Sequence, residues 1–203
     1  MLPIPPWSEL RARLPRLLFG LVLFGLGLAF MVVADLGLAP WEVLHQGISR
    51  RTGIPIGTVG IITGLLVLVA WIPLGERIGV GTIANVILIG VVIDLTLLVL
   101  PEQLDQLIMR WAALMGGLLL VAIGSGYYIG AGLGPGPRDG LMTGLNRRTG
   151  YPIGAVRAVL EVAVLIAGWL LGGTVGIGTV LFAFGIGPMV QFFLNRLSLP
   201  ARR

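Results

Sequence analysis

The chain has 203 residues, a mean hydropathy of +0.99 and only 11% charged residues. This composition excludes an ordinary soluble domain and predicts an integral membrane protein in a lipid bilayer. The formal net charge is +5 at pH 7, but the arginines lie at the ends of apolar segments, as in membrane proteins generally, so we expect no nucleic-acid partner. Cysteine is absent, which excludes disulfides and thiolate metal sites.

Six apolar runs approach the roughly 20 residues that a helix needs to cross the hydrocarbon. They follow a proline-rich, arginine-bearing lead of residues 1–15, which we expect in the cytoplasm. The runs cover residues 17–34, 56–74, 80–100, 111–131, 153–171 and 177–194. The sequence therefore predicts an all-α fold, a polytopic membrane helix bundle with six spans.

One stretch of the chain occurs twice. Residues 37–57 carry Gly-Leu-Ala-Pro-Trp-Glu and Arg-Arg-Thr-Gly-Ile-Pro-Ile-Gly, and residues 134–154 carry Gly-Pro-Gly-Pro-Arg-Asp and Arg-Arg-Thr-Gly-Tyr-Pro-Ile-Gly. The offset of 97 continues without a gap on both sides, so we infer two tandem repeats. The expected units are a first membrane repeat at 16–98, a connecting loop and start of the fourth span at 99–112, a second membrane repeat at 113–195 and a basic tail at 196–203.

The repeat also bears on the first apolar run, which ends in Val32-Val33-Ala34 and resembles a signal-peptidase site. Its equivalent, residues 113–131, lies in the middle of the chain and must be a membrane helix. We therefore expect the first run to be a span rather than a cleaved signal peptide.

A short helix is predicted inside each repeated stretch. Pro40 and Pro137 suit the first turn of a helix, and Gly53 and Gly150 suit its left-handed end. Each short helix either lies at the interface, which makes the second repeat upside down, or forms part of a broken crossing, which makes the repeats parallel. Counting arginines does not separate the two models, and both place the two termini in the cytoplasm.

The first turns of the short helices carry equivalent carboxylates, Glu42 and Asp139. A carboxylate there complements the helix dipole, but two that meet at mid-membrane would form a cation or proton site. Arg138 beside Asp139 opens the opposite possibility, an anionic head group at a helix N-terminus. His45 lies on the same face as Glu42 and is absent from the second copy, so it is a weak metal signal that suits a role in protonation.

Three further ionisable residues fall inside predicted spans, where each is a functional candidate by default. Arg157 and Glu161 are four residues apart and share a helical face. They form either a buried structural ion pair or a substrate or coupling-ion site. Asp94, in the last third of the third span, is either a proton-titrating carboxylate or a solvated end residue.

Glycines spaced by four recur along the chain and let helix backbones approach closely. They suggest packing positions and candidate contacts of a homodimer: Gly60 and Gly64, Gly126 and Gly130, Gly140 and Gly144, Gly168 and Gly172.

The paired motifs resemble the bacterial YczE/YyaS/YitT family of integral membrane proteins, and most closely its YczE branch. The likeness rests on Gly-Leu-x-Pro-Trp-Glu-Val-Leu-His-Gln-Gly, Gly-Pro-Arg-Asp-Gly-Leu-Met-Thr-Gly and Gly-Gly-Thr-Val-Gly-Ile-Gly-Thr. That branch typically has Ser-Pro where this chain has Ala39-Pro40 and Gly136-Pro137. The resemblance implies a multi-pass protein of the bacterial plasma membrane and supplies no catalytic residue.

We expect a small-solute permease or exporter, coupled or not to protons, with a site between the repeats and no cofactor or metal. The alternative is a scaffold or accessory protein whose arginine-rich ends dock a cytoplasmic enzyme. The chain shows no nucleophile and base set, so we do not expect an enzyme. Deletion of residues 1–12 and 198–203 would abolish docking but spare transport.

Overall fold

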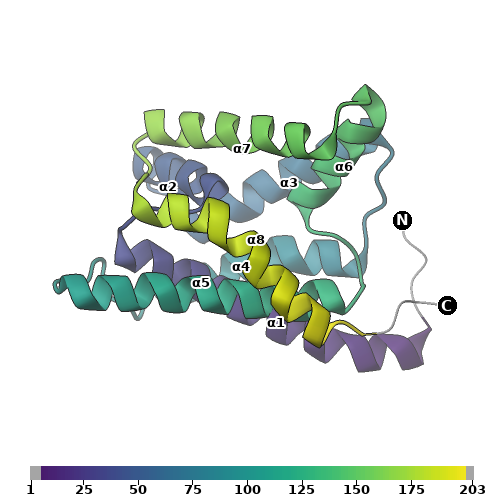
Figure 1. Cartoon of the computed structure of the whole chain (residues 1–203), viewed down its shortest axis with the longest axis horizontal. Coiled ribbons are helices and arrows are strands. Elements are labelled where there is room, and N and C mark those ends of the chain that lie inside the picture. Colours follow the sequence, from purple (N-terminus) through teal and green to yellow (C-terminus); the bar gives the residue numbers. More distant parts are fainter. Residues whose placement is uncertain (1–5, 200–203) are drawn as a thin grey trace.

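The computed structural model describes residues 6–199, and within this range it contains eight α-helices and no strand (Figure 1). The helices are α1 (Trp7–Ala34), α2 (Pro40–Thr52), α3 (Ile56–Leu74), α4 (Val80–Leu97), α5 (Leu107–Gly130), α6 (Pro137–Thr149), α7 (Ile153–Leu170) and α8 (Ile177–Leu197). Six of them are long and apolar enough to cross a membrane, and only α2 and α6 are not. The predicted all-α, six-span membrane bundle is confirmed.

The helix bounds differ from the predicted runs at several ends, and two of these differences have a clear structural setting. Helix α1 begins at Trp7, well before the apolar run, so the described part of the expected lead is helical. Residues 1–5 of that lead and residues 200–203 of the basic tail lie outside the described range. Helix α4 ends at Leu97 rather than residue 100, because Pro101 follows and the residue before a proline is disfavoured in the α region.

The two short helices begin and end where the sequence predicted. Pro40 and Pro137 are their first residues, and Gly53 and Gly150 follow their last turns with φ of +75°. Proline lacks a backbone N–H, which would have no intrahelical partner in the first turn, and glycine adopts positive φ without a steric cost. These local rules account for both helices.

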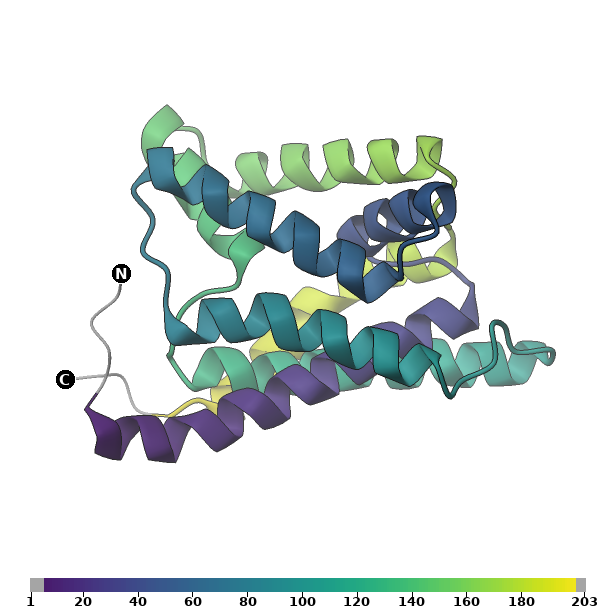
Figure 2. The ribbon, with the colours of Figure 1, turned by 180° about the vertical axis from the view of Figure 1, so that it is seen from behind.

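The long helices run between two ends of the bundle. We call the end that holds Trp7 and Leu197 the terminal end, and the end that holds Ala34 and Ile177 the far end (Figure 1). Helix α1 runs from the terminal end to the far end and α5 runs back, so the two halves of the chain point in opposite directions (Figures 1 and 2).

The short helices do not cross the bundle. The chain enters the interior after α1, and α2 returns to the far end, where Arg50 Nη1 donates to Gly172 O at 2.5 Å. Helix α6 likewise returns to the terminal end, where Arg147 Nη2 donates to Leu74 O at 2.8 Å. Both helices therefore begin inside the bundle and end at its surface.

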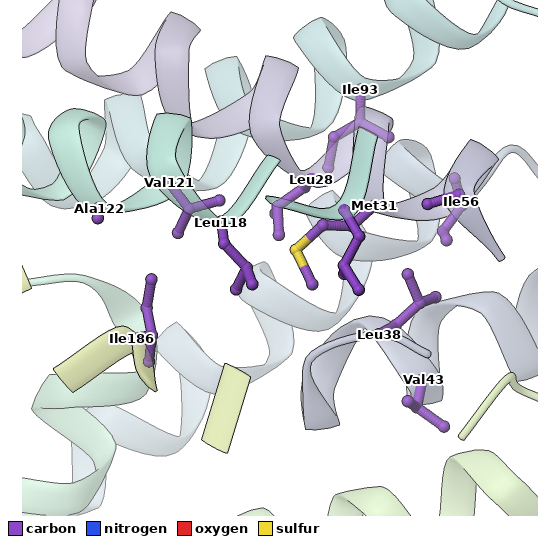
Figure 3. Packing of buried hydrophobic residues seen from close by; sticks show 12 residues of the cluster. Leu28, Met31, Leu38, Val43, Ile56, Ile93, Leu118, Val121, Ala122 and Ile186 are labelled. Atoms are coloured by element: carbon purple, nitrogen blue, oxygen red, sulfur yellow. The ribbon is translucent and has the colours of Figure 1, made fainter. Parts of the chain in front are cut away.

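Close backbone contacts join α1 to α5. A Cβ on Gly20 would lie 2.7 Å from Gly124 O, and a Cβ on Gly27 would lie 2.6 Å from Gly117 O. Only glycine permits this approach between two helices. Buried apolar residues of α1 and α5, joined by Val43 of α2 and Ile186 of α8, form the main core around this seam (Figure 3).

Each short helix packs on a span of the opposite half. Helix α2 lies against α7, where Gly168 meets the backbone of Val43. Helix α6 lies against α3, where Trp71 Nε1 donates to Pro137 O at 3.0 Å. Several glycines that the sequence offered as dimer contacts are thus used within the chain: Gly126, Gly130, Gly140, Gly144 and Gly168.

Candidate functional site

A cavity of about 380 Å³ lies inside the bundle, where the first turns of α2 and α6 approach each other. Its volume falls in the range of small-molecule sites. The lining includes every ionisable site candidate except Asp94. These residues are Glu42, His45, Arg138, Asp139, Arg157 and Glu161. Tertiary structure therefore brings together side chains that are more than 100 residues apart in sequence.

An ion pair between the two halves forms one wall of the cavity. Arg138 Nη2 donates to Glu42 Oε1 at 2.5 Å, and Nη1 lies 3.4 Å from Oε2. The Glu42 side chain is 3% exposed, whereas that of Arg138 is 30% exposed. The Arg138 guanidinium also stacks over the Trp41 ring at 5.1 Å. Glu42 depends on this partner, because an unpaired buried carboxylate is costly.

His45 extends the same network. Its Nδ1 lies 3.9 Å from Glu42 Oε1, and its Nε2 lies 2.8 Å from Thr63 Oγ1. A protonated His45 would therefore add a second positive charge beside Glu42. Within residues 6–199, no three His, Asp or Glu side chains gather closely enough to hold a metal ion.

Asp139 lies across the cavity in a different setting. Its carboxylate interacts with the Tyr128 hydroxyl, and in the described part of the chain it forms no ion pair within 4.0 Å. Trp41, also in the lining, has a buried indole N–H without a hydrogen-bond partner. The site thus offers a ligand one carboxylate that has no ion-pair partner among the described residues.

The predicted ion pair between Arg157 and Glu161 is present on α7, where Arg157 Nε donates to Glu161 Oε1 at 2.9 Å. It is not buried: the two side chains are 56% and 26% exposed. They line the cavity on the side of α7. An exposed pair of this kind adds little stability, so the structure does not support a role in holding the fold.

Asp94 lies outside the cavity. It accepts hydrogen bonds from Gly57 N at 2.6 Å and from the N–H and hydroxyl of Thr58, both at 2.7 Å. These contacts satisfy free N–H groups in the first turn of α3 and complement its dipole. From the sequence, Asp94 was expected to be either a proton-titrating carboxylate or a solvated residue at the end of a span. In the structure its carboxylate instead forms a contact between α4 and α3.

The polar residues of the lining that sequence reasoning missed include Trp41, Thr63 and Tyr128. The repeat could have identified Trp41, because this residue occupies the position equivalent to Arg138. Thr63 and Tyr128 carried no such signal, because they lie within ordinary apolar spans.

The fold and the cavity define a polytopic helical membrane protein with a charged internal cavity between two re-entrant short helices. The chain belongs to a family of unknown function, DUF6198, whose model matches residues 11–195. An uncharacterized protein of Haemophilus influenzae is 41% identical, over 95% of this chain and 88% of that protein. No solved structure matches.

Two further relatives come from Bacillus subtilis. The uncharacterized membrane protein YczE is 34% identical over 92% of this chain and 87% of that protein. The uncharacterized protein YyaS is 26% identical over 86% of this chain and 89% of that protein. The resemblance to the YczE/YyaS family is confirmed.

Proposed function

We propose that the protein is a small-solute permease or exporter whose site is the cavity between the two halves. The observation that carries this proposal is the meeting of the two short helices, each beginning inside the bundle with a carboxylate in its first turn. Broken or re-entrant segments that line a cavity at the interface of repeats are the usual substrate sites of secondary transporters.

An internal duplication underlies the proposal and is supported by the helix bounds. Both α2 and α6 have 13 residues, and Pro40 and Pro137 are 97 positions apart. The offset of 97 makes Gly117 the equivalent of Gly20 and Gly124 the equivalent of Gly27. In the structure Gly20 contacts Gly124 and Gly27 contacts Gly117, so the contacts are exchanged between the two copies. That exchange is expected for two copies related by a two-fold axis in the membrane plane.

We place the chain in the bacterial plasma membrane with both termini in the cytoplasm. Because α2 and α6 do not cross, most arginines near the helix ends lie at the terminal end. By the helix bounds and their hydrogen bonds, these are Arg11, Arg13, Arg16, Arg77, Arg147, Arg148 and Arg196, against Arg50, Arg51 and Arg110 at the far end. Cytoplasmic loops carry such an excess of basic residues.

The charge of the cavity favours a solute with a cationic group. Three carboxylates, Glu42, Asp139 and Glu161, face two guanidinium groups, Arg138 and Arg157. Asp139 is the one without an ion-pair partner among the described residues, so it is the expected contact of an amine. A local excess of negative charge in a site with apolar walls concentrates cations.

The test uses sealed proteoliposomes loaded with a bacterial small-molecule extract, with efflux followed by mass spectrometry. The unaltered protein should release at least one amine-bearing solute, and Asp139→Asn should slow that release at least tenfold. Val159→Ala, on the exposed face of α7, is the matched control and should behave as the parent. The proposal would be contradicted if vesicles with the parent protein and vesicles with Asp139→Asn released the same solutes at the same rate.

The scaffold alternative receives less support. Arg13 Nη1 donates to Ala131 O at 2.9 Å, and Arg16 Nη2 donates to Leu197 O at 2.5 Å. These arginines bind carbonyls at the ends of α5 and α8 rather than standing free for a docked enzyme. Deletion of the terminal segments remains the experiment that separates the two functions.

A further inference from the structure

The α3–α4 and α7–α8 pairs occupy equivalent places in the two halves but are packed differently. Helices α3 and α4 cross closely at Gly57 and Gly90, where a Cβ on either glycine would collide with the carbonyl oxygen of the other. This crossing lies near the far end of the bundle, where the two helices converge (Figure 2).

The equivalent glycines of the second half do not meet. Gly154 and Gly187 each have open space, with nothing within 4 Å of an added Cβ. Helices α7 and α8 diverge from their connection at the far end toward the terminal end (Figure 1), and they hardly touch. Residues of both helices line the cavity between them. The second half thus carries the glycines of a close crossing that it has not formed.

Asp94 forms a polar contact within the closed pair. It joins α4 to α3 through three hydrogen bonds to Gly57 and Thr58. The equivalent of Asp94 is Gln191, whose amide instead donates to Asn195 Oδ1 of its own helix at 2.6 Å. The equivalent of Thr58 is Ala155, which has no hydroxyl. The second half therefore lacks the contact that joins the first.

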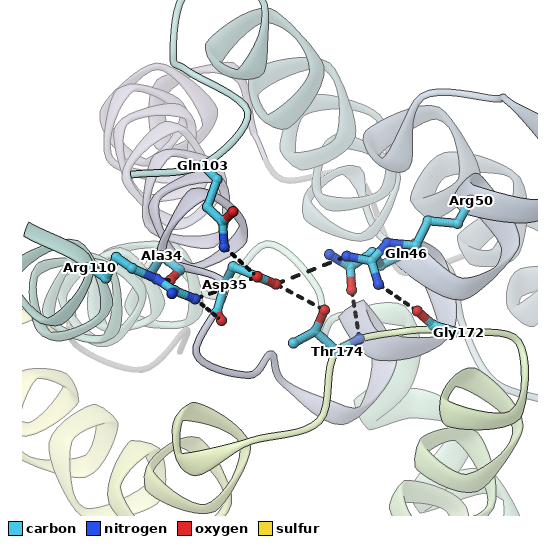
Figure 4. A network of polar contacts seen from close by, with 8 residues as sticks. All are labelled: Ala34, Asp35, Gln46, Arg50, Gln103, Arg110, Gly172 and Thr174. Carbon is cyan, nitrogen blue, oxygen red and sulfur yellow. Dashed lines mark hydrogen bonds and ion pairs between the residues drawn. The ribbon is translucent and has the colours of Figure 1, made fainter. Parts of the chain in front are cut away.

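A second network closes the far end. Asp35, after α1, accepts hydrogen bonds from Gln103 Nε2 at 2.8 Å and from Thr174 Oγ1 at 3.1 Å (Figure 4). Arg110 Nη2 lies 3.4 Å from Asp35 Oδ2. These contacts join α1, the α4–α5 connection, α5 and the α7–α8 connection. Both observations place the closed side of the cavity at the far end.

We propose that the α3–α4 pair and the α7–α8 pair are two gates of one passage, and that Asp94 is the positioning residue that latches the far gate. The structure is the state with the far gate closed and the terminal gate open. In the opposite state, Gly154 and Gly187 come together as Gly57 and Gly90 do here. The inference rests on the proposed passage of a solute.

The absence of cysteine allows both gates to be measured by spin labels in the full-length protein in lipid vesicles. Ile54→Cys with Leu95→Cys reports on the far gate. Tyr151→Cys with Phe192→Cys, the equivalent positions, reports on the terminal gate. All four side chains are at least 36% exposed. The expected distance is shorter at the far gate than at the terminal gate.

The decisive variant introduces the Asp94 contact into the second half of the chain. Gln191→Asp with Ala155→Thr copies Asp94 and Thr58 onto the second half, and it should shift the Tyr151–Phe192 distance distribution to shorter values. Gly154→Ala added to this variant should abolish the shift, because its Cβ has room in the open state but would collide in the closed one. An unchanged distribution in the first variant, or an undiminished shift in the second, overturns the proposal.

Asp94→Asn provides an independent test if the transplanted latch does not fold. It should lengthen the far-gate distance and shorten the terminal-gate distance, and no change at either gate would overturn the proposal. These measurements need no solute. Gates that move without any efflux would count against the proposed transport, whereas efflux with immobile gates would count against this inference.

Discussion

The ion pair between Arg138 and Glu42 gives the sharpest test of the cavity. Arg138→Met would leave a carboxylate that is 3% exposed without its cation. Removing one partner of a buried pair typically costs about 3–5 kcal/mol. Because the Arg138 side chain is 30% exposed and water screens part of the interaction, we expect the lower limit, about 3 kcal/mol of unfolding free energy.

Two variants isolate the charge from the packing. Glu42→Gln with Arg138→Met should recover most of the loss, because no buried charge is left unpaired. Arg157→Met is the matched control, since its pair with Glu161 is exposed and contributes about 0.5 kcal/mol or less.

The assay is reversible unfolding in mixed micelles, followed by tryptophan fluorescence and circular dichroism. Equal losses for Arg138→Met and Arg157→Met would refute the reasoning. A double variant as unstable as Arg138→Met would do so too, because the penalty would then come from lost packing against Trp41 rather than from the charge.

Three other outcomes are expected. A cysteine at Ser49 and one at Asn146 are placed in separate variants, and an impermeant thiol reagent should label only one of them in intact cells; the same accessibility at both positions would contradict the inverted halves. Trp71→Phe should lower stability by at least about 1 kcal/mol, because it removes the hydrogen bond to Pro137 O and leaves a gap beside a fully buried ring; an unchanged unfolding midpoint would show that neither contact contributes. Glu161→Gln should change solute efflux more than stability, and a variant that simply unfolds would make the pair structural.

Local patterns in the sequence determined most of the helices. Hydropathy placed the six spans to within a few residues at most ends, and Pro40 and Gly53 marked the ends of a short helix. These features depend on interactions within about one helical turn, or on the thickness of the bilayer, so a linear reading captures them. The spacing of Arg157 and Glu161 predicted their pairing for the same reason, although not their exposure.

Only the tertiary structure decided how the short helices lie and which charges meet. The length of the repeated stretch allowed either a crossing or a return, and packing of α2 on α7 favours the return. Arg138 pairs with Glu42, 96 positions away, rather than with its neighbour Asp139. Asp94 binds the start of α3, 36 and 37 positions earlier. Such contacts depend on how whole helices pack, and periodicity along the chain carries no information about them.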